Sequence, residues 1–218
     1  MISKKRRVRN PTTILGNFEI PHKYKKQSMT MMTDFIFRRF TVGSFGINGF
    51  LIADPETGIG VFIDPGGFSA GIETFIQEQK IQLNFLFFTH GHWDHTEGLP
   101  DFNSRYKIES YAGHGEVRDT KHQLQGGEMI EVGNLKFQAI SIQGHTPHGI
   151  SFYGHGCVFT GDALMCGSIG GTGSSKAAQC QIEHVRKRIF TLPDETLVFP
   201  AHGPMTTVGI EKSSNPFF

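Results

Sequence analysis

The sequence predicts an α/β (α+β) fold in which two mixed β-sheets pack face to face and helices cover their outer sides. Three observations support this prediction. Short apolar runs of strand length recur in both halves of the chain, turns containing Gly and Pro separate them, and each group of strands is followed by a stretch with helical periodicity. With 218 residues, 38% hydrophobic side chains and 20 Phe, the chain can bury a sizeable core.

The first half begins with three β-type runs, which read FIFRRF, FGINGFLIAD and GVFIDPGG. Their close spacing predicts antiparallel hairpins. The third run ends in the turn signal Asp64–Gly67, and Ser69 is a suitable N-cap for a helix over residues 70–80 with Ile72, Phe75 and Ile76 on one face. The aromatic run Phe85–Phe88 then predicts a buried strand that ends in a polar loop.

The second half repeats this pattern with shorter segments. Gly133-Asn134 and Gly154–Gly156 are tight-turn signals between pairs of strands. A Pro- and Gly-rich end follows the last strand. We predict strands over residues 107–111, 128–132, 135–142, 149–153, 157–160 and 196–199, a short helix over His114–Val117 and a longer helix over Ala177–Phe190.

Charge divides the chain into two parts. Residues 1–32 contain eight Lys or Arg and one acid, a charge of +7, whereas the remainder contains 13 basic and 19 acidic side chains, a charge of −6. We interpret residues 1–32 as a basic, disordered N-terminal arm, or as an upstream extension if the true start is Met29, Met31 or Met32, and residues 33–218 as one domain. The mildly acidic domain argues against a nucleic-acid-binding surface there.

Cysteine content and hydropathy favour a cytoplasmic protein without a membrane partner. Cys157, Cys166 and Cys180 provide no disulfide framework in a chain of this length. The sequence contains no apolar run of 18 residues, and its basic start lacks the apolar core of a secretory signal. The sequence leaves the oligomeric state open.

Side chains that bind metals follow the ends of four predicted strands. The first group comes within a few residues after Phe85–Phe88 and reads HGHWDH, and single residues beside Gly or Pro follow three further strands. Because strand ends at one edge of a sandwich converge, we expect seven residues to meet at one site, namely His90, His92, Asp94, His95, His145, Asp162 and His202.

Imidazole and carboxylate together suit a divalent metal, and burying such groups without a partner is costly. Seven N and O ligands are too many for one tetrahedral zinc and suit two metals that share a bridge. The alternative that these are ordinary surface residues at turns is disfavoured, because residue type, order and strand-end position agree. A second alternative, which stays open, is that the protein has the fold but binds metal poorly.

THGHWDH resembles the THxHxDH signature of the metallo-β-lactamase-fold hydrolases, and GHTPHGISFY, FTGDAL and PAHGP resemble the later motifs of that superfamily in the same order. The resemblance covers residues 35–218. It is nearest to the short glyoxalase II-like (hydroxyacylglutathione hydrolase-like) group, whose GSIG motif and Glu-Lys…Asn-Pro-Phe tail occur here at Gly167–Gly170 and Glu211–Phe217. The resemblance implies the αββα four-layer sandwich of the metallo-β-lactamase fold.

The resemblance also implies roles for the site residues. Two divalent ions are expected, with Zn²⁺ first and Fe or Mn as alternatives. A hydroxide that bridges two such ions can exist near neutral pH, because metal binding lowers the pKa of water to ~7. Asp94, both ligand and proton acceptor, is the expected catalytic residue. The first metal would be held by His90, His92 and His145, the second by Asp94, His95 and His202, with Asp162 as the bridge.

Departures from the family pattern concern substrate binding. Gly171 and Gly173 stand where the group has the Arg and Asp of GSIGRTD, and His148 replaces the second Gly of GHTPGG. The segment before the last helix is shortened, and the sequence ends without the C-terminal helical domain with which long glyoxalase II enzymes help bind glutathione. We therefore expect substrate choice to be made at the loop Gly171–Gly173.

Other candidate side chains have simpler interpretations. For His148 a loop role is preferred over contact with substrate. Cys166 is expected to be a buried structural Cys rather than a thiolate ligand, because Asp162 fills the bridging position. The Phe-rich segments are expected in the core. Five further His lack a strand-end motif and are expected at the surface or in turns, namely His22, His114, His122, His155 and His184.

These observations predict a metal-dependent hydrolase of small-molecule thioesters, of the S-lactoylglutathione type, or of related acyl esters. A mononuclear-iron persulfide dioxygenase, with iron held by two His and an Asp, is the first alternative because the THxHxDH motif does not separate the two classes. A lactonase is the second. A nucleic-acid-processing enzyme or RNA-binding protein that uses the basic arm is the third, and a β-lactamase role is disfavoured without a Cys-type second site.

Overall fold

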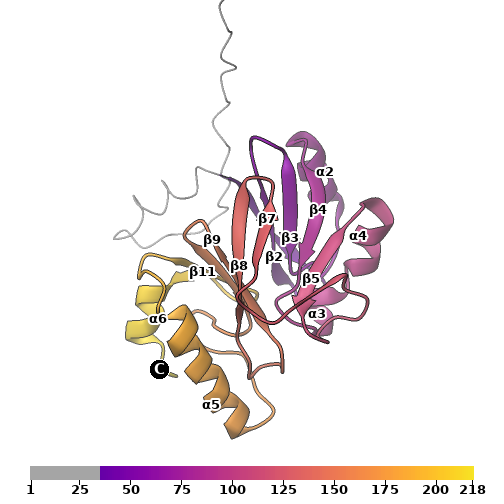
Figure 1. Cartoon of the computed structure of the whole chain (residues 1–218). Coiled ribbons are helices and arrows are strands. Elements are labelled where there is room, and N and C mark those ends of the chain that lie inside the picture. Colours follow the sequence, from indigo (N-terminus) through magenta and orange to yellow (C-terminus); the bar gives the residue numbers. More distant parts are fainter. Residues whose placement is uncertain (1–34) are drawn as a thin grey trace, which may run out of the picture.

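The computed structural model describes residues 35–218, so the predicted basic arm and His22 lie outside the described residues. Two six-stranded sheets form the centre of the described region, with strand orders β1-β2-β3-β4-β5-β6 and β12-β11-β10-β9-β8-β7 (Figure 1). Each sheet contains both parallel and antiparallel neighbours, which confirms the predicted pair of mixed sheets.

The first sheet begins with an antiparallel meander, as predicted, and continues with parallel strands. The second sheet is antiparallel except for the parallel pair β10 and β11. The strands are β1 (Ile36–Val42), β2 (Ile47–Ala53), β3 (Ile59–Ile63), β4 (Gln82–Phe87), β5 (Glu109–Gly113), β6 (His122–Leu124), β7 (Met129–Val132), β8 (Leu135–Ser141), β9 (Ile150–Gly154), β10 (Cys157–Gly161), β11 (Leu197–Pro200) and β12 (Thr206–Thr207).

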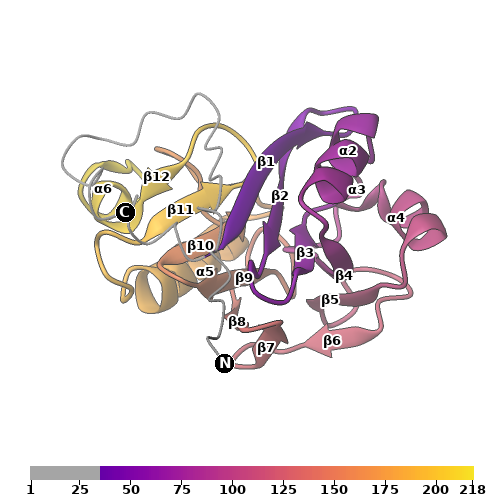
Figure 2. The same cartoon turned by 90° about the horizontal axis from the view of Figure 1, so that it is seen from above.

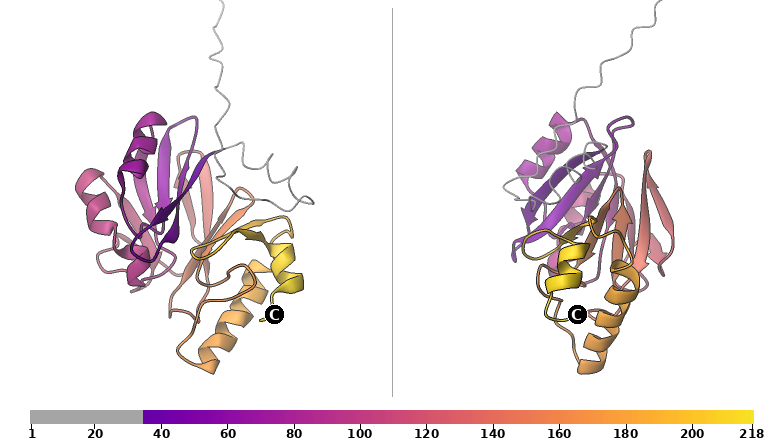
Figure 3. Two further views of the ribbon diagram at one scale, coloured as in Figure 1. Left: turned by 180° about the vertical axis from the view of Figure 1, so that it is seen from behind. Right: turned by 90° about the vertical axis from the view of Figure 1, so that its left-hand side faces the viewer.

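Helices cover the outer side of each sheet (Figures 2 and 3). The first sheet carries α2 (Ala70–Glu78), α3 (Trp93–Thr96) and α4 (Leu99–Arg105). The second sheet carries α5 (Ser175–His184), the π-helix η1 (Val185–Ile189) and α6 (Val208–Ser214). The four layers are those of the metallo-β-lactamase fold, as the sequence resemblance implied.

The largest apolar cluster lies between the two sheets and is rich in Phe, which confirms that the Phe-rich segments form the core. Phe87 of the first sheet stacks on Phe152 of the second with ring centroids 4.6 Å apart. Burying one Phe side chain contributes about 1.5–3 kcal/mol, so this cluster fixes how the sheets face each other. Two further clusters lie under the helices on either side.

Local sequence signals explain the elements that were predicted correctly. The Ser69 hydroxyl accepts a hydrogen bond from the Ile72 amide and caps α2, whose buried residues are Ile72, Phe75 and Ile76. The tight turn between β9 and β10 has His155 and Gly156 at positive φ, the conformation that such hairpins require.

Two helix predictions need correction. The short helix over His114–Val117 is wrong, because this segment is a turn in which Gly115 adopts a φ of +72°. The helix predicted over Ala177–Phe190 begins earlier, because the Ser174 hydroxyl accepts from the Ala177 amide and acts as the N-cap. Its last turns form the π-helix η1.

Several short elements escaped prediction. β6 and β12 have three and two residues, too few for an alternating pattern. The Pro- and Gly-rich end contains α6, which Thr207 caps by accepting from the Ile210 amide. None of the helices between residues 35 and 218 combines the length and the apolar character that a membrane span requires.

Candidate metal centre

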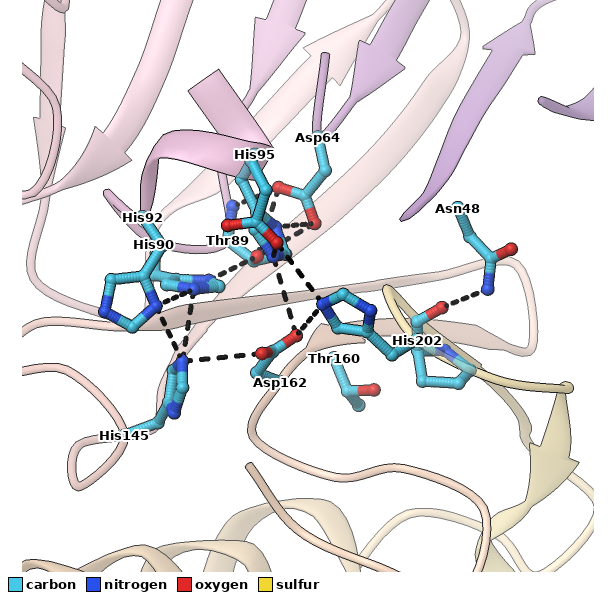
Figure 4. A network of polar contacts seen from close by, with 12 residues as sticks. Asn48, Asp64, Thr89, His90, His92, His95, His145, Thr160, Asp162 and His202 are labelled. Carbon is cyan, nitrogen blue, oxygen red and sulfur yellow. Dashed lines mark hydrogen bonds and ion pairs between the residues drawn. The ribbon is translucent and has the colours of Figure 1, made fainter. Parts of the chain in front are cut away.

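The structure brings all seven predicted residues together at one end of the sandwich (Figure 4). β4 of the first sheet leads into the loop and helix α3 that carry four of them. β8, β10 and β11 of the second sheet run in the same direction, because β9 is antiparallel to β8 and β10, and β11 is parallel to β10. Their carboxyl ends therefore lie side by side and deliver His145, Asp162 and His202.

The first group consists of three imidazoles that aim one nitrogen each at a common point. His90 Nε2 lies 2.9 Å from His92 Nδ1, and His145 Nε2 lies 3.2 Å and 3.0 Å from these two atoms. A hydrogen bond joins one N–H to one lone pair, so three mutually facing nitrogens cannot all be paired by protons. A cation accepts all three lone pairs, and two nitrogens at about 2.0–2.1 Å from a tetrahedral zinc lie roughly 3.3 Å apart.

The second group consists of Asp94, His95 and His202. Asp94 Oδ2 lies 3.7 Å from His95 Nε2 and 3.4 Å from His202 Nε2. His95 is fully buried, and its Nε2 makes no hydrogen bond to the described residues. A buried nitrogen without a partner is costly, so the Nε2 atom of His95 is suited to bind a metal ion.

Asp162 lies between the two groups. Its Oδ2 is 3.5 Å from His145 Nε2, and its Oδ1 is 3.5 Å from His95 Nε2 and 3.6 Å from His202 Nε2. Asp162 Oδ1 is buried and makes no hydrogen bond within residues 35–218. One carboxylate thus offers one oxygen to each group.

These donors fit divalent metal ions. Three sets of residues have ligand atoms within 4.8 Å of one another, and imidazole and carboxylate are the donors that Zn, Fe and Mn share. The sets are His90 with His92 and His145, His90 with His95 and Asp162, and Asp94 with His95 and His202.

The electrostatics of the site favour a positive charge at its centre. Burial and the charge on His95 lower the pKa of His90 to about 2, and burial also lowers the pKa of His92, so both rings present lone pairs. Burial alone lowers the pKa of His95, but Asp64 and Asp162 outweigh it and raise that pKa to about 10. Proximity to His95 overrides burial and holds the pKa of Asp162 far below its usual range. A metal ion held by His95 would take the place of its proton.

A second layer of residues orients the imidazoles. His145 Nδ1 lies 2.6 Å from the carbonyl oxygen of Gly171, a contact that leaves Nε2 free for a ligand when Nδ1 carries the proton. Asp64, buried at the end of β3, lies 3.2 Å from His95 Nδ1 and accepts hydrogen bonds from the Thr89 amide and hydroxyl. Sequence reasoning treated Asp64 only as part of a turn, because Asp before Pro-Gly-Gly is a common turn signal.

Two glycines allow the ligand turns to form. Gly144 and Gly161 precede His145 and Asp162 and adopt φ values of +136° and +53°. A Cβ on Gly161 would lie 2.2 Å from the Thr89 hydroxyl, and a Cβ on Gly144 would lie 2.4 Å from the Gln181 Cβ. Only glycine therefore fits directly before these two ligands.

A family model supports the same interpretation over most of the chain. The model of the metallo-beta-lactamase superfamily matches residues 42–202. The chain belongs to the metallo-beta-lactamase superfamily. Among curated proteins of this superfamily, the hydroxyacylglutathione hydrolase GloC of Haemophilus influenzae is 29% identical over 81% of this chain and 94% of its own length. The hydroxyacylglutathione hydrolase of Nitrosomonas eutropha is 34% identical over 65% of this chain and 56% of its own length.

Solved structures of the superfamily share the fold. The B3 metallo-beta-lactamase BLEG-1 has a TM-score of 0.76 at 24% identity, covering 83% of this chain and 98% of its own. ETHE1 from Myxococcus xanthus has a TM-score of 0.74 at 30% identity, covering 83% of both chains. TTHA1623, solved in a di-iron-bound form, has a TM-score of 0.71 at 26% identity, covering 83% of this chain and all of its own.

In this member of the superfamily, two polar side chains hold the ligand loops in place. Glu116 accepts hydrogen bonds from the Gly91 amide at 3.0 Å and the His148 amide at 2.7 Å, and so joins the loops that follow β4 and β8. The Asn48 amide group donates to the carbonyl oxygens of Pro200 and Gly203, on either side of His202. Neither residue has a strand-end motif, so the sequence alone did not single them out.

Two exposed aromatic side chains lie next to the ligand segment of this superfamily member. Trp93, between two ligand positions, and Phe45 of the β1–β2 turn are 57% and 71% exposed and meet edge to face at 5.9 Å.

The prediction that Cys166 is buried is wrong. Cys166 and Gly167 form the exposed tip of a turn closed by hydrogen bonds between Met165 and Ser168, and Cys166 belongs to none of the candidate metal groups between residues 35 and 218.

The remaining histidines lie as expected. His114 and His148 are exposed in turns, and His155 lies in the β9–β10 turn. His122 is exposed on β6, and His184 at the end of α5 accepts a hydrogen bond from the Gln143 amide. None of them belongs to the metal groups found among the described residues.

Proposed function

We propose that this protein is a metal-dependent hydrolase of small acyl thioesters that holds two divalent metal ions. In this proposal Zn²⁺ is the first choice of ion, with Fe and Mn as alternatives. One ion is held by His90, His92 and His145, the other by Asp94, His95 and His202, and Asp162 is shared.

The position of Asp162 is the observation that carries the proposal. Its two oxygens face two separate groups of three side chains, at 3.5 Å from His145 on one side and 3.5–3.6 Å from His95 and His202 on the other. A single ion uses three or four of these seven donors and leaves the others without a metal. Similarity to proteins named hydroxyacylglutathione hydrolase supports a thioester as the substrate.

The ions supply Lewis acidity, which polarises the carbonyl oxygen and lowers the pKa of a water molecule to ~7. The residues of the chain then have three tasks. Asp94, which is partly exposed and close to both His95 and His202, accepts the proton of the attacking water. Asp64 and the Gly171 carbonyl hold the rings of His95 and His145 in place. Trp93, which lies between the ligands His92 and Asp94, and Phe45, which packs against it, offer an exposed apolar contact to the substrate.

The deciding experiment measures metal content and S-lactoylglutathione hydrolysis on the same purified protein. We expect two divalent ions per chain and hydrolysis that is lost on chelation and restored by zinc. Fewer than two ions in the fully active protein would contradict the dinuclear proposal, and an inactive protein with both ions bound would contradict the substrate.

Replacing Asp94 by Ala tests the proton acceptor. We expect Asp94→Ala to lower kcat by about 10²–10⁴-fold, the usual contribution of a general base, with a folded structure by circular dichroism. Asp101→Ala, an exposed carboxylate on α4, is the matched control and keeps full activity. Near-complete activity in Asp94→Ala would place the proton acceptor elsewhere.

A mononuclear-iron persulfide dioxygenase is the second candidate, since two His and one Asp also meet here. His145 Nε2 lies 3.2 Å from His90 Nε2 and 3.5 Å from Asp162 Oδ2. The similarity to ETHE1 makes this alternative worth testing. One iron per chain together with oxygen consumption on glutathione persulfide would replace the hydrolase proposal, and turnover of lactones in place of thioesters would indicate a lactonase.

We also propose that the protein is located in the cytoplasm, a reducing compartment. Cys157, Cys166 and Cys180 are all unpaired. Burial raises the pKa of the Cys157 thiol to about 12, which keeps that thiol unreactive.

A further inference from the structure

A groove runs from the rim of the candidate metal centre along the end of β8. Its near part has a volume of ≈ 310 Å³ and is lined by His114, His148, Gln143 and others. Its far part has a volume of ≈ 490 Å³ and reaches Arg188. Gln125 and Ser141 line both parts, so the two parts adjoin each other. These volumes lie in the range of sites that bind small molecules.

The near end of the groove adjoins the metal ligands through the β8–β9 loop. His148 follows His145 by three residues, and its ring meets the His114 ring edge to face at 5.7 Å. Glu116 holds the His148 amide and so fixes this end. Ser141 precedes His145 by four residues, so their Cα atoms lie within about 14 Å of each other. A molecule the size of a short peptide therefore spans the distance from the metal centre into the groove.

The far end carries a guanidinium. Arg188 lies on the π-helix η1, and its Nη1 donates a hydrogen bond of 2.6 Å to the Ser141 carbonyl oxygen, which holds the side chain against the groove wall. This contact uses one of the five N–H donors of Arg188, and a guanidinium pairs with a carboxylate through two of them at once. A π-helical turn inside a helix frequently marks a functional site.

The lining of the groove suits a peptide with a negative end. No Asp or Glu is among the residues that line either part. Glu128, in the adjoining loop, has both carboxylate oxygens occupied by the amides of Gln125 and Gly126. The side-chain amides of Gln125, Gln138 and Gln143 can donate to and accept from the amides of a peptide.

We propose that this groove binds the thiol half of the thioester substrate, a short peptide thiol, and that Arg188 pairs with a carboxylate of that peptide. The inference rests on the proposed hydrolase function and adds the place where the leaving group lies. It moves substrate selection away from the loop Gly171–Gly173, where the two glycines offer no side chain. Gln125 and Gln143 are the further residues that contact the peptide.

Binding of S-methylglutathione tests the groove without any turnover, and this probe has no free thiol to bind a metal. We expect Arg188→Gln to weaken binding of S-methylglutathione to the metal-loaded protein by about tenfold, measured by calorimetry, as for loss of a charge-assisted hydrogen bond. The matched control is Lys187→Gln, which removes the same charge from the same turn, where Lys187 pairs with Glu183. This control leaves binding unchanged.

Hydrolysis supplies the second measurement. For Arg188→Gln we expect the KM for S-lactoylglutathione to rise about tenfold with kcat kept, whereas kinetics with S-lactoyl-N-acetylcysteamine, whose thiol carries no carboxylate, stay unchanged. Gln keeps an N–H that can donate to the Ser141 carbonyl oxygen, so the thermal unfolding midpoint is expected to match the wild type.

The possible outcomes distinguish a failure of the groove proposal from a failure of the proposed hydrolase function. Binding in Arg188→Gln equal to the wild type, equal losses in Arg188→Gln and Lys187→Gln, or no binding to the wild type would overturn the groove. Binding that depends on Arg188 in a protein that hydrolyses neither thioester would support the groove and overturn the proposed function.

Discussion

Asp162 and Glu211 are two carboxylates of the second half of the molecule that differ in how they are paired. Glu211 is buried on α6, and its oxygens accept hydrogen bonds from the Thr206 hydroxyl at 2.7 Å, the Gly167 amide at 2.9 Å and the Asn215 side chain at 2.8 Å. Asp162 faces only imidazoles, at 3.5–3.6 Å, and its buried Oδ1 has no hydrogen bond within the described region.

The difference distinguishes a structural carboxylate, Glu211, from one that is free to bind a ligand, Asp162. A buried carboxylate whose acceptors are all used stabilises the fold and has no capacity left for chemistry. A buried carboxylate oxygen that accepts no hydrogen bond keeps its capacity to bind a cation. Both residues lie in motifs of the family resemblance, but only their partners show which is which.

The largest expected effect comes from neutralising the unpaired carboxylate. Asp162→Asn keeps the shape of the side chain and removes its charge, so we expect metal content to fall below two ions per chain and hydrolysis to fall by about 10³-fold, as when a group that stabilises transition-state charge is lost. Elemental analysis and steady-state kinetics measure both. Two bound ions in Asp162→Asn would show that Asp162 is not the shared ligand.

Removing Glu211, the hydrogen-bonded carboxylate, is expected to lower stability and to leave metal binding intact, the reverse of Asp162→Asn. Glu211→Ala leaves three donors without their acceptor, so we expect the free energy of unfolding to fall by about 2–4 kcal/mol, measured with denaturant, while the folded protein keeps its metal. Glu131→Ala, an exposed carboxylate on β7, is the control and changes stability by less than about 0.5 kcal/mol. Loss of metal without loss of stability in Glu211→Ala would reverse the assignment of the two carboxylates.

The pH dependence of stability tests the charge on His95, the imidazole that lies next to Asp162. The pKa of His95 is raised from 6.5 to about 10, so the metal-free protein gains stability from this proton that is fully present below pH 6.5. We expect its free energy of unfolding to decrease as the pH rises from 6.5 through 10. In the metal-loaded protein the ion replaces the proton, and this decrease disappears. Equal pH profiles with and without metal would contradict the charge placed on His95.

The smallest expected effects concern two neighbouring glycines beside Asp162 and His145. A Cβ at Gly170 would lie 2.4 Å from the Asp162 carbonyl oxygen and 2.8 Å from His145 Nδ1, whereas a Cβ at Gly171 meets no atom within 4 Å. We expect Gly170→Ala to weaken metal binding about tenfold, and Gly171→Ala to keep it and raise stability by about 0.4–1 kcal/mol. Competition with a chromogenic chelator and thermal unfolding measure the pair. Equal effects of the two substitutions would show that the loop is not held as described.

The parts that the sequence predicted share a physical cause. An apolar run that ends in Gly or Pro marks a strand end, and His or Asp at several such ends indicates a ligand that they share. Asp64 and Glu116 escaped because their partners, Thr89 and Gly91, are 25 residues away and no local pattern connects them. Cys166 was misplaced for a different reason: a local turn, closed by hydrogen bonds between Met165 and Ser168, exposes it.

The origin of the seven ligands has a mechanical consequence. Four come from the chain after β4 of the first sheet and three from strand ends of the second, so the two ions of the proposed centre would join the two sheets at this end of the sandwich. At the other end, Asp54 of the first sheet accepts from the Asn134 amide of the second at 2.8 Å, a tie that needs no ion. If the proposal holds, we expect chelation to weaken the contact between the sheets at the ligand end and not at the other, so that amide exchange becomes faster first around His90 and His145.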